Sequence, residues 1–378
     1  MTNKNKVIAG LHINRIVIKL GTSLLITKDI KPNLDYFNKL ANDISQIRNA
    51  GIEVILVTSG AIGVGMGKLN MKARPRTIPG KQAVAAVGQG SLMHLYETVF
   101  SEYNIQVAQI LLTREDVENR IRYLNARNTL LTLLDLKVLP IINENDTVAV
   151  EEIKFGENDN LAALITNLIE ADFLIILSDT DGLCTKDPRT NKDAVVIPIV
   201  KKITPEIEKL AGGAGTCVST GGMYTKILAG KKVTSSGNTM IIANGRKQNI
   251  LTDIVLNNKS HGTLFLPSQD KMDSRKKWIA FTLSPQGKIK VDKGAEEALV
   301  LKGKSLLPSG IKEIEGKFNI GDAITIINIE GKEIAKGLVN YNYEELKAIR
   351  GAKTKDIESL LGYKYFDEVV HRDNMVLL

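Results

Sequence analysis

The 378-residue sequence has only two cysteines, Cys184 and Cys217, and their spacing matches neither a metal site nor a disulfide framework. Aromatic residues are few, and no apolar run approaches the roughly 20 residues that a membrane span needs. The opening segment, MTNKNKVIAG, lacks the apolar core of a signal peptide. These absences argue against a disulfide-stapled secreted domain and a membrane-spanning protein, and they predict a cytoplasmic location.

The composition is that of an ordinary globular protein, with 43% hydrophobic and 24% charged residues. The length suffices for a large core and for two or three domains. The formal net charge of +8 suits an anionic ligand such as a nucleotide, or a nucleic acid. The simpler interpretation of the charge alone is a bias shared by the proteins of the host.

Short β-branched runs alternate with helical patterns through the first two-thirds of the chain. The predicted strands are residues 15–20, 53–58, 106–112, 138–142, 172–178 and 239–243. Several are apolar along their whole length, as expected for parallel strands that are covered on both faces. The pattern predicts an α/β sandwich around a mostly parallel sheet, whose ligands bind beyond the carboxyl ends of the strands.

The pattern changes near residues 268–277, which are polar and then basic. Short strands punctuated by glycine follow, without the alternation of strand and helix seen before. We therefore predict an α/β catalytic domain over residues 1–270 and a small β-rich domain over residues 277–378.

Two glycine-rich turns follow predicted strands. Lys19 ends the first strand and precedes Gly21, so the turn is neither a P-loop nor a dinucleotide fingerprint. In the second turn, Ser59 and the neighbouring N–H groups would suit a carboxylate or a phosphate. For either turn alone, tight packing between a strand and a helix is the alternative interpretation.

Two Asn/Asp clusters, residues 143–146 and 158–160, lie in one loop region. The alternatives are a simple turn for the first cluster, and N-capping by Asp159 and Asn160 of a helix predicted over residues 160–170. Because both clusters lie near the ends of strands or helices, we favour a polar binding site.

Two further segments suit a nucleotide. Ser178 and Asp179 end an apolar strand, although on their own they indicate only a polar turn. Residues 211–226 form a glycine-rich loop that leads into a helix beginning near Met223, where free N–H groups would face an anion. Lys226 in the first helical turn opposes the helix dipole, which favours phosphate binding over a plain surface loop.

Together these motifs resemble the amino acid kinase family. The resemblance rests on IVIKLGTSLL, VTSGAIGVG, AAVGQGSLM, LLTREDVENRIRYLNARNTL, PIINENDTVAVEEIKFGENDNLAAL, GLCTKDPR and GTCVSTGGMYTK, which appear in the order of the family. The later segments GIKEIEGKFNIGDAITI and VHRDNM resemble a PUA domain. The resemblance implies a three-layer αβα sandwich followed by a PUA-like domain. Cys184 departs from the pattern, since the family more often has an aromatic residue there.

The resemblance also implies an activity: ATP-dependent phosphorylation of the side-chain carboxylate of L-glutamate, the first step of proline biosynthesis, with Mg²⁺. It implies that Lys19 and Lys226 contact the ATP phosphates and that Asp159 organises both lysines. The implied nucleotide site consists of Lys19, Ser178, Asp179, Thr220, Gly221, Gly222, Met223, Tyr224, Thr225 and Lys226. The implied glutamate site consists of Ser59, Asp146 and Asn158. A carboxylate nucleophile is already ionised at neutral pH, so no general base is needed.

The resemblance further implies proline as a feedback inhibitor. We expect it to compete with glutamate at Ser59 and Asp146, with residues 114–127 as a nearby modulating loop. A homodimer or homotetramer is expected, and glutamyl phosphate reductase is a further candidate partner.

Other activities stay open. Kinases of the same superfamily act on N-acetylglutamate, aspartate, carbamate or UMP. Asp146 suits a free α-ammonium group, and a UMP site should contain more arginine. RNA binding through the PUA-like domain is an alternative of a different class, which the low aromatic content disfavours.

Overall fold

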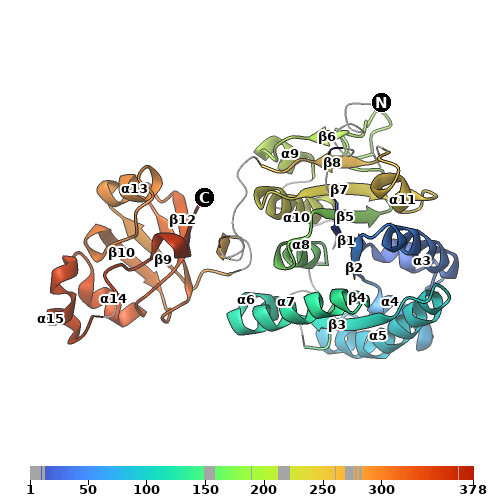
Figure 1. Cartoon of the computed structure of the whole chain (residues 1–378), viewed down its shortest axis with the longest axis horizontal. Coiled ribbons are helices and arrows are strands. Elements are labelled where there is room, and N and C mark those ends of the chain that lie inside the picture. The colour runs from blue at the N-terminus through green and yellow to red at the C-terminus, as the bar shows by residue number, and fades with distance from the viewer. Residues whose placement is uncertain are drawn as a thin grey trace. The chain divides into compact units, whose positions relative to one another are not determined.

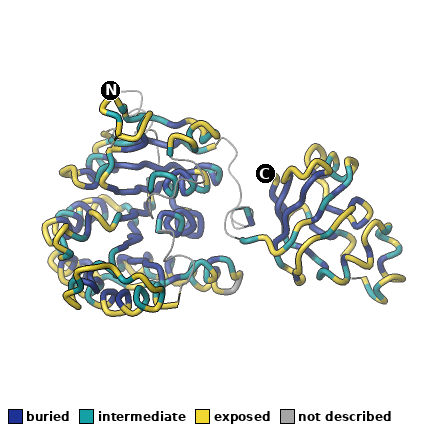
Figure 2. Tube along the Cα trace, turned by 180° about the vertical axis from the view of Figure 1, so that it is seen from behind, coloured by how far each residue is buried: buried dark blue, intermediate teal, exposed yellow. Residues whose placement is uncertain are grey.

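The computed structural model describes residues 10, 13–148, 158–188, 190–211, 222–259, 261–268, 276, 279–280, 283–364 and 366–378. The chain forms two compact units, Met1–Lys271 and Met272–Leu378 (Figure 1). In both units the sheet strands carry much of the buried surface (Figure 2). None of the described helices is both long enough and apolar enough to cross a bilayer.

The first unit is built on an eight-stranded sheet with the order β3-β4-β2-β1-β5-β7-β8-β6. The strands are β1 Arg15–Leu20, β2 Glu53–Val57, β3 Val107–Leu112, β4 Leu139–Glu144, β5 Phe173–Ser178, β6 Ile199–Val200, β7 Thr239–Asn244 and β8 Thr263–Phe265. All neighbours pair in parallel except β7 and β8. The six predicted strands are confirmed, whereas β6 and β8 were missed because they are too short to show a pattern.

Helices cover both faces of this sheet (Figure 1). They are α2 Thr22–Leu25, α3 Leu34–Asn49, α4 Ala61–Lys68, α5 Ile78–Ser101, α6 Arg114–Glu118, α7 Arg120–Asp135, α8 Asn158–Leu168, α9 Pro205–Leu210, α10 Met223–Ser235 and α11 Ile250–Val255. Ile16, Ile18 and Leu20 of β1 pack into one core with α3, α4, α5 and α11. Successive strand residues point to opposite faces, so Val17 and Lys19 face α8 and α10. The predicted αβα sandwich is confirmed.

Three sequence-based interpretations differ from the structure, and two of them, N-capping by Asp159 and a simple turn, were the alternatives to a binding site. The helix predicted over residues 160–170 begins two residues earlier, so Asp159 lies inside α8 and does not cap it. The first polar cluster is a turn only in part, because Asn143 and Glu144 belong to β4 whereas Asp146 lies in the turn after it. Residues 114–127 are not a loop, because they lie largely in α6 and α7, where a capping box starts the shorter helix.

Helices α4 and α5 approach each other until their backbones touch. A Cβ atom built on Gly88 of α5 would lie 1.8 Å from the Ala61 carbonyl oxygen of α4, and one on Gly65 would lie 2.0 Å from the Val84 oxygen. No side chain larger than hydrogen fits at either position. This contact fixes α5 beside the start of α4, and therefore beside the turn that carries Ser59.

We expect Gly88→Ala to lower the free energy of unfolding by about 1–3 kcal/mol, because the added methyl group must push two backbones apart. Gly90→Ala is the matched control, since nothing lies within 4 Å of its Cβ position. Alanine is the better helix former, so the control should gain about 0.5–1 kcal/mol. Urea unfolding of both variants tests this. Equal effects would show that the close approach of α4 and α5 does not limit the residue at position 88.

The second unit contains a five-stranded sheet with the order β10-β9-β11-β12-β13. Its strands are β9 Gly287–Val291, β10 Ile311–Gly316, β11 Ala323–Ile327, β12 Glu333–Leu338 and β13 Met375–Leu377. Its helices are α13 Lys293–Val300, α14 Tyr343–Ile349 and α15 Ile357–Leu361, with 3₁₀ turns at Pro308–Gly310, Thr354–Asp356 and Arg372–Asn374. These elements enclose a core of their own. The small β-rich C-terminal domain predicted from the sequence is confirmed as a fold.

Candidate active site

Parallel pairing brings the predicted site residues to one edge of the large sheet. Strands β1, β2, β4 and β5 run in the same direction, so their carboxyl ends meet there. Lys19 lies near the end of β1, and Ser178 is the last residue of β5. Ser59 and Asp146 each follow two residues after the end of a strand, β2 and β4. The expectation that ligands bind at this edge therefore has a group of polar side chains to support it.

A buried ion cluster joins β1, α8 and α10. The Lys19 ammonium lies 2.8 Å from Oδ1 of Asp159, and the Lys226 ammonium lies 3.0 Å from Oδ2 of the same carboxylate. The side chain of Asp159 is fully buried, and those of the two lysines are 8% and 6% exposed. In the sequence, only the family resemblance linked Lys19, Lys226 and Asp159. In the structure, the three side chains are in direct contact.

The electrostatics of the cluster follow from burial and charge. Burial alone would raise the pKa of Asp159, but the ammonium groups of Lys19 and Lys226 hold that pKa at about 2. Burial lowers the pKa of Lys19, and the Asp159 carboxylate partly offsets that shift. With two basic side chains and one acidic one, the cluster has a formal excess of positive charge. It therefore suits an additional anion.

The first turn of α10 faces this cluster. Gly222 is its N-cap and provides no side-chain cap, so the N–H groups at the helix start have no capping side chain. Thr225 Oγ1 lies 2.7 Å from Asp159 Oδ2, which ties the turn to the cluster. Gly222, Met223 and Tyr224 are half-buried there, whereas Thr220 and Gly221 lie outside the described residues.

A second polar network lies at the ends of β2 and β4. The Asn158 amide nitrogen donates to Ser59 Oγ at 3.0 Å and to Asn143 Oδ1 at 3.3 Å. The Asn143 amide nitrogen donates in turn to Gln89 Oε1 of α5 at 2.8 Å. The structure thus joins two of the three predicted glutamate residues, Ser59 and Asn158. Asp146 is half-buried in the turn after β4.

The end of β5 lies beside β1 and completes the edge. Ser178 Oγ donates to Asp179 Oδ1 at 3.2 Å. Beyond it, Asp181 and Lys247 form an ion pair of 2.7 Å, which the sequence analysis did not anticipate. Cys184 forms an antiparallel bridge with Val196 and is half-buried, so the residue that departs from the family pattern sits at a regular backbone position.

Gln89 was also missed. It lies in the quoted segment AAVGQGSLM, where it is a lone amide among small and apolar residues on a helix. That isolation is the signal that would have found it, because a buried polar side chain needs a hydrogen-bonding partner. Asn143 was noted only as part of a cluster.

No group of three or more His, Cys, Asp or Glu side chains suited to a metal ion occurs among the described residues. Asp159 does not fill that role, because both of its oxygens lie against ammonium groups.

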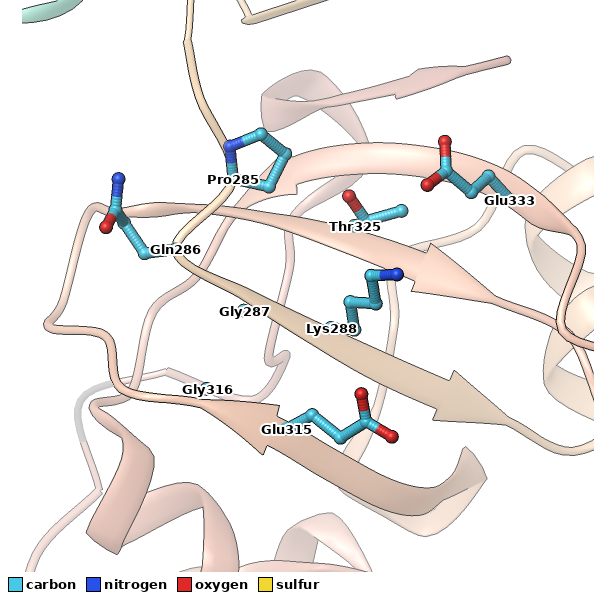
Figure 3. Close-up of a pocket in the computed structure, with 8 residues that line it drawn as sticks. All are labelled: Pro285, Gln286, Gly287, Lys288, Glu315, Gly316, Thr325 and Glu333. Atoms are coloured by element: carbon cyan, nitrogen blue, oxygen red, sulfur yellow. The ribbon is translucent and has the colours of Figure 1, made fainter.

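The C-terminal unit has an open hollow of about 420 Å³ on its sheet. Figure 3 shows the Lys288 side chain between those of Glu315 and Glu333, with Thr325 beside it. Two carboxylates around one ammonium group do not suit a phosphate backbone, which binds to clustered positive charge. This hollow gives no support to RNA binding.

Two family models match the chain, one in each of its two units. The family model described as "Amino acid kinase family" matches residues 14–244, well over half of the chain. The chain belongs to the amino acid kinase family. The model of the PUA domain matches residues 287–361, within the second unit.

Among relatives of this amino acid kinase, three glutamate 5-kinases match nearly end to end. The protein from Caldanaerobacter subterraneus subsp. tengcongensis is 56% identical over 96% of this chain and 98% of its own length. The Thermoanaerobacter sp. protein is 54% identical over the same shares. The Moorella thermoacetica protein is 50% identical over all of both chains. Within the family, the chain groups with the glutamate 5-kinases.

Proposed function

We propose that this amino acid kinase transfers the γ-phosphoryl group of ATP to the side-chain carboxylate of L-glutamate, giving L-glutamyl 5-phosphate. The observation that carries the proposal is the buried cluster in which Lys19 and Lys226 converge on Asp159 beside the start of α10. The names of the relatives and the polar network around Ser59 support glutamate as the acceptor.

The reaction is a direct displacement. A carboxylate oxygen of glutamate forms a bond to the γ-phosphorus, while the bond from that phosphorus to the β,γ-bridging oxygen breaks and ADP leaves. The glutamate side chain is ionised at neutral pH, so no proton has to be removed. The main obstacle is the approach of an anion to a polyanion, which positioned cations overcome.

The two ammonium groups would supply these cations from two sides. Lys19 approaches from β1 and Lys226 from α10, and Asp159 holds both before the nucleotide binds. Ser178, Asp179 and the residues from Thr220 to Lys226 would hold ATP. Ser59, Asp146 and Asn158 would hold glutamate. Mg²⁺ would be held largely by the phosphates of ATP.

Incubation of the purified protein with ATP, Mg²⁺ and hydroxylamine tests the proposal. Hydroxylamine traps an acyl phosphate as a coloured hydroxamate. L-Glutamate should give the product, while N-acetylglutamate and aspartate should give little. ADP release with UMP, measured in parallel, should stay at background. A preference for any of the other acceptors would reject glutamate as the substrate.

We expect Asp146→Asn to raise the KM for glutamate by about tenfold or more, because it removes the proposed partner of the α-ammonium group. The KM for ATP should change much less. Initial rates over a grid of both substrates give the two constants. A folded variant with the wild-type KM for glutamate would remove Asp146 from the acceptor site.

The other partners stay predictions. Competition by proline should make its inhibition weaken as glutamate rises, because both ligands would share Ser59 and Asp146. Helices α6 and α7 would border that site in place of the predicted loop. Assembly into a homo-oligomer and contact with glutamyl phosphate reductase likewise stay predictions.

A further inference from the structure

Gln89 is a buried amide that none of the proposed roles uses. It is 9% exposed and follows Gly88, the residue through which α5 touches the backbone of α4. The close contact of the two helices therefore places Gln89 beside Asn143 near the end of β4. The side chain of Asn143 is buried there, at 1% exposed. A polar side chain held this deeply is retained at a free-energy cost unless it has partners.

Gln89 begins a series of hydrogen-bonded amides, and its own Nε2 is buried without a hydrogen-bonding partner. Its Oε1 accepts from the nitrogen of Asn143, which leaves Asn143 Oδ1 to accept from the nitrogen of Asn158. That nitrogen also donates to Ser59 Oγ, so both of its hydrogens are used. With the Gln89 oxygen facing Asn143, the orientations of Asn143 and then of Asn158 are each set by the amide before them.

The direction of the hydrogen bonds between these amides decides which donor and acceptor groups the site presents to a ligand. Ser59 Oγ accepts a hydrogen bond, so its own O–H is directed elsewhere and is available as a donor. Asn158 Oδ1 is buried and has no hydrogen-bonding partner. With the amides reversed, Asn158 would turn its oxygen toward Ser59 and its nitrogen outward, and the acceptor would be lost.

We propose that Gln89 is a positioning residue that sets the acceptor preference of the kinase by fixing the orientation of Asn143 and Asn158. The site then presents a hydroxyl donor suited to an α-carboxylate and a carbonyl acceptor suited to an α-ammonium group. This inference rests on the proposed function, because it concerns the glutamate site. Gln89 itself does not touch the substrate and acts through the two asparagines.

The test compares Gln89→Met with Gln89→Glu. Methionine keeps the approximate length and removes the acceptor, so both amide orientations become accessible. The glutamate KM of Gln89→Met should rise about tenfold, while its ATP KM stays within about twofold of wild type. Glutamate retains oxygens that accept from Asn143, so Gln89→Glu should keep the orientation of the amides.

The decisive readout is selectivity. Glutarate lacks the α-ammonium group and otherwise matches the acceptor. The ratio of kcat/KM for L-glutamate to that for glutarate should fall about tenfold in Gln89→Met and stay within about threefold of wild type in Gln89→Glu. Gly90→Ala, on the same helix beside Gln89 with open space at its Cβ, should change neither constant.

Asn143→Leu removes the next amide in the same hydrogen-bonded series. It provides a second test of the proposal if Gln89→Met does not fold. It should lower the same ratio, and the double variant should lower it no further than either single variant. An unchanged ratio in these variants, or equal rises in the KM of both substrates, would make Gln89 a packing residue. The proposed function is judged separately, by whether the wild-type protein forms any hydroxamate from L-glutamate.

Discussion

Replacing Lys226 by methionine should lower kcat by a factor of about 10² to 10³, and Lys19→Met should do the same. Each change removes a cation that would lie against the phosphoryl group as it is transferred. Losing one such contact in a water-excluded site costs on the order of 3 kcal/mol in the transition state. Binding of ground-state ATP should suffer less, because the remaining lysine and the N–H groups of α10 stay in place.

The matched control is Lys231→Met, five residues further along α10. Its side chain is 56% exposed and pairs with Glu208 at 2.8 Å, away from the cluster. Exposed ion pairs contribute little, so kcat should stay within about twofold of wild type. Steady-state rates of hydroxamate formation, with ATP and glutamate both saturating, measure all three variants. Should Lys226→Met raise the KM for ATP and leave kcat unchanged, the lysine binds the nucleotide without assisting the transfer.

The second large effect is expected at Asp159. Asp159→Asn removes the carboxylate that lies against two buried ammonium groups, and an uncompensated buried charge typically destabilises a protein by about 3–5 kcal/mol. The phosphates of Mg·ATP carry the missing negative charge. Saturating Mg·ATP should therefore raise the Tm of Asp159→Asn more than that of the wild-type protein.

Asp43 on α3 provides the comparison, because it is also a buried aspartate, 1% exposed. Burial raises the pKa of Asp43 to about 6, whereas the pKa of Asp159 is held at about 2. A carboxyl with a raised pKa contributes stability at low pH that is lost as the pH rises through 6. A carboxylate with a depressed pKa contributes stability above about pH 4 that is lost as the pH falls toward 2.

At pH 8 we therefore expect Asp43→Asn to be neutral or slightly stabilising and Asp159→Asn to be strongly destabilising. Thermal unfolding of both variants between pH 4 and pH 8 would measure this. The pH-dependent loss of stability between about pH 4 and pH 6 should shrink in Asp43→Asn. Similar Tm values for the two variants at pH 8 would mean that the lysines of the cluster do not depend on Asp159.

Much of the fold was present in local patterns. Buried parallel strands are apolar along their length, which is why β1, β5 and β7 were predicted to within one residue at each end. Strand β8 pairs with β7, and β6 pairs with β8. These strands of two or three residues depend on that pairing and show no pattern of their own in the sequence. Helix α8 began earlier than predicted, because Asn158 and Asp159 are polar and belong to the site as well as to the helix.

For the site, the sequence by itself determined which residue types end the strands: a lysine after an apolar run, a serine beside glycine, and a lysine in the first turn of a helix. It did not determine which of them meet. Lys19 and Lys226 are far apart in the chain, and only the parallel register of β1 and β5 and the packing of α8 and α10 place Asp159 between them. Gln89 depends still more on tertiary structure, because its contact with Asn143 requires two helices to approach at Gly65 and Gly88. Sequence patterns report the periodicity of one element at a time, whereas hydrogen bonds between elements depend on distances that only packing sets.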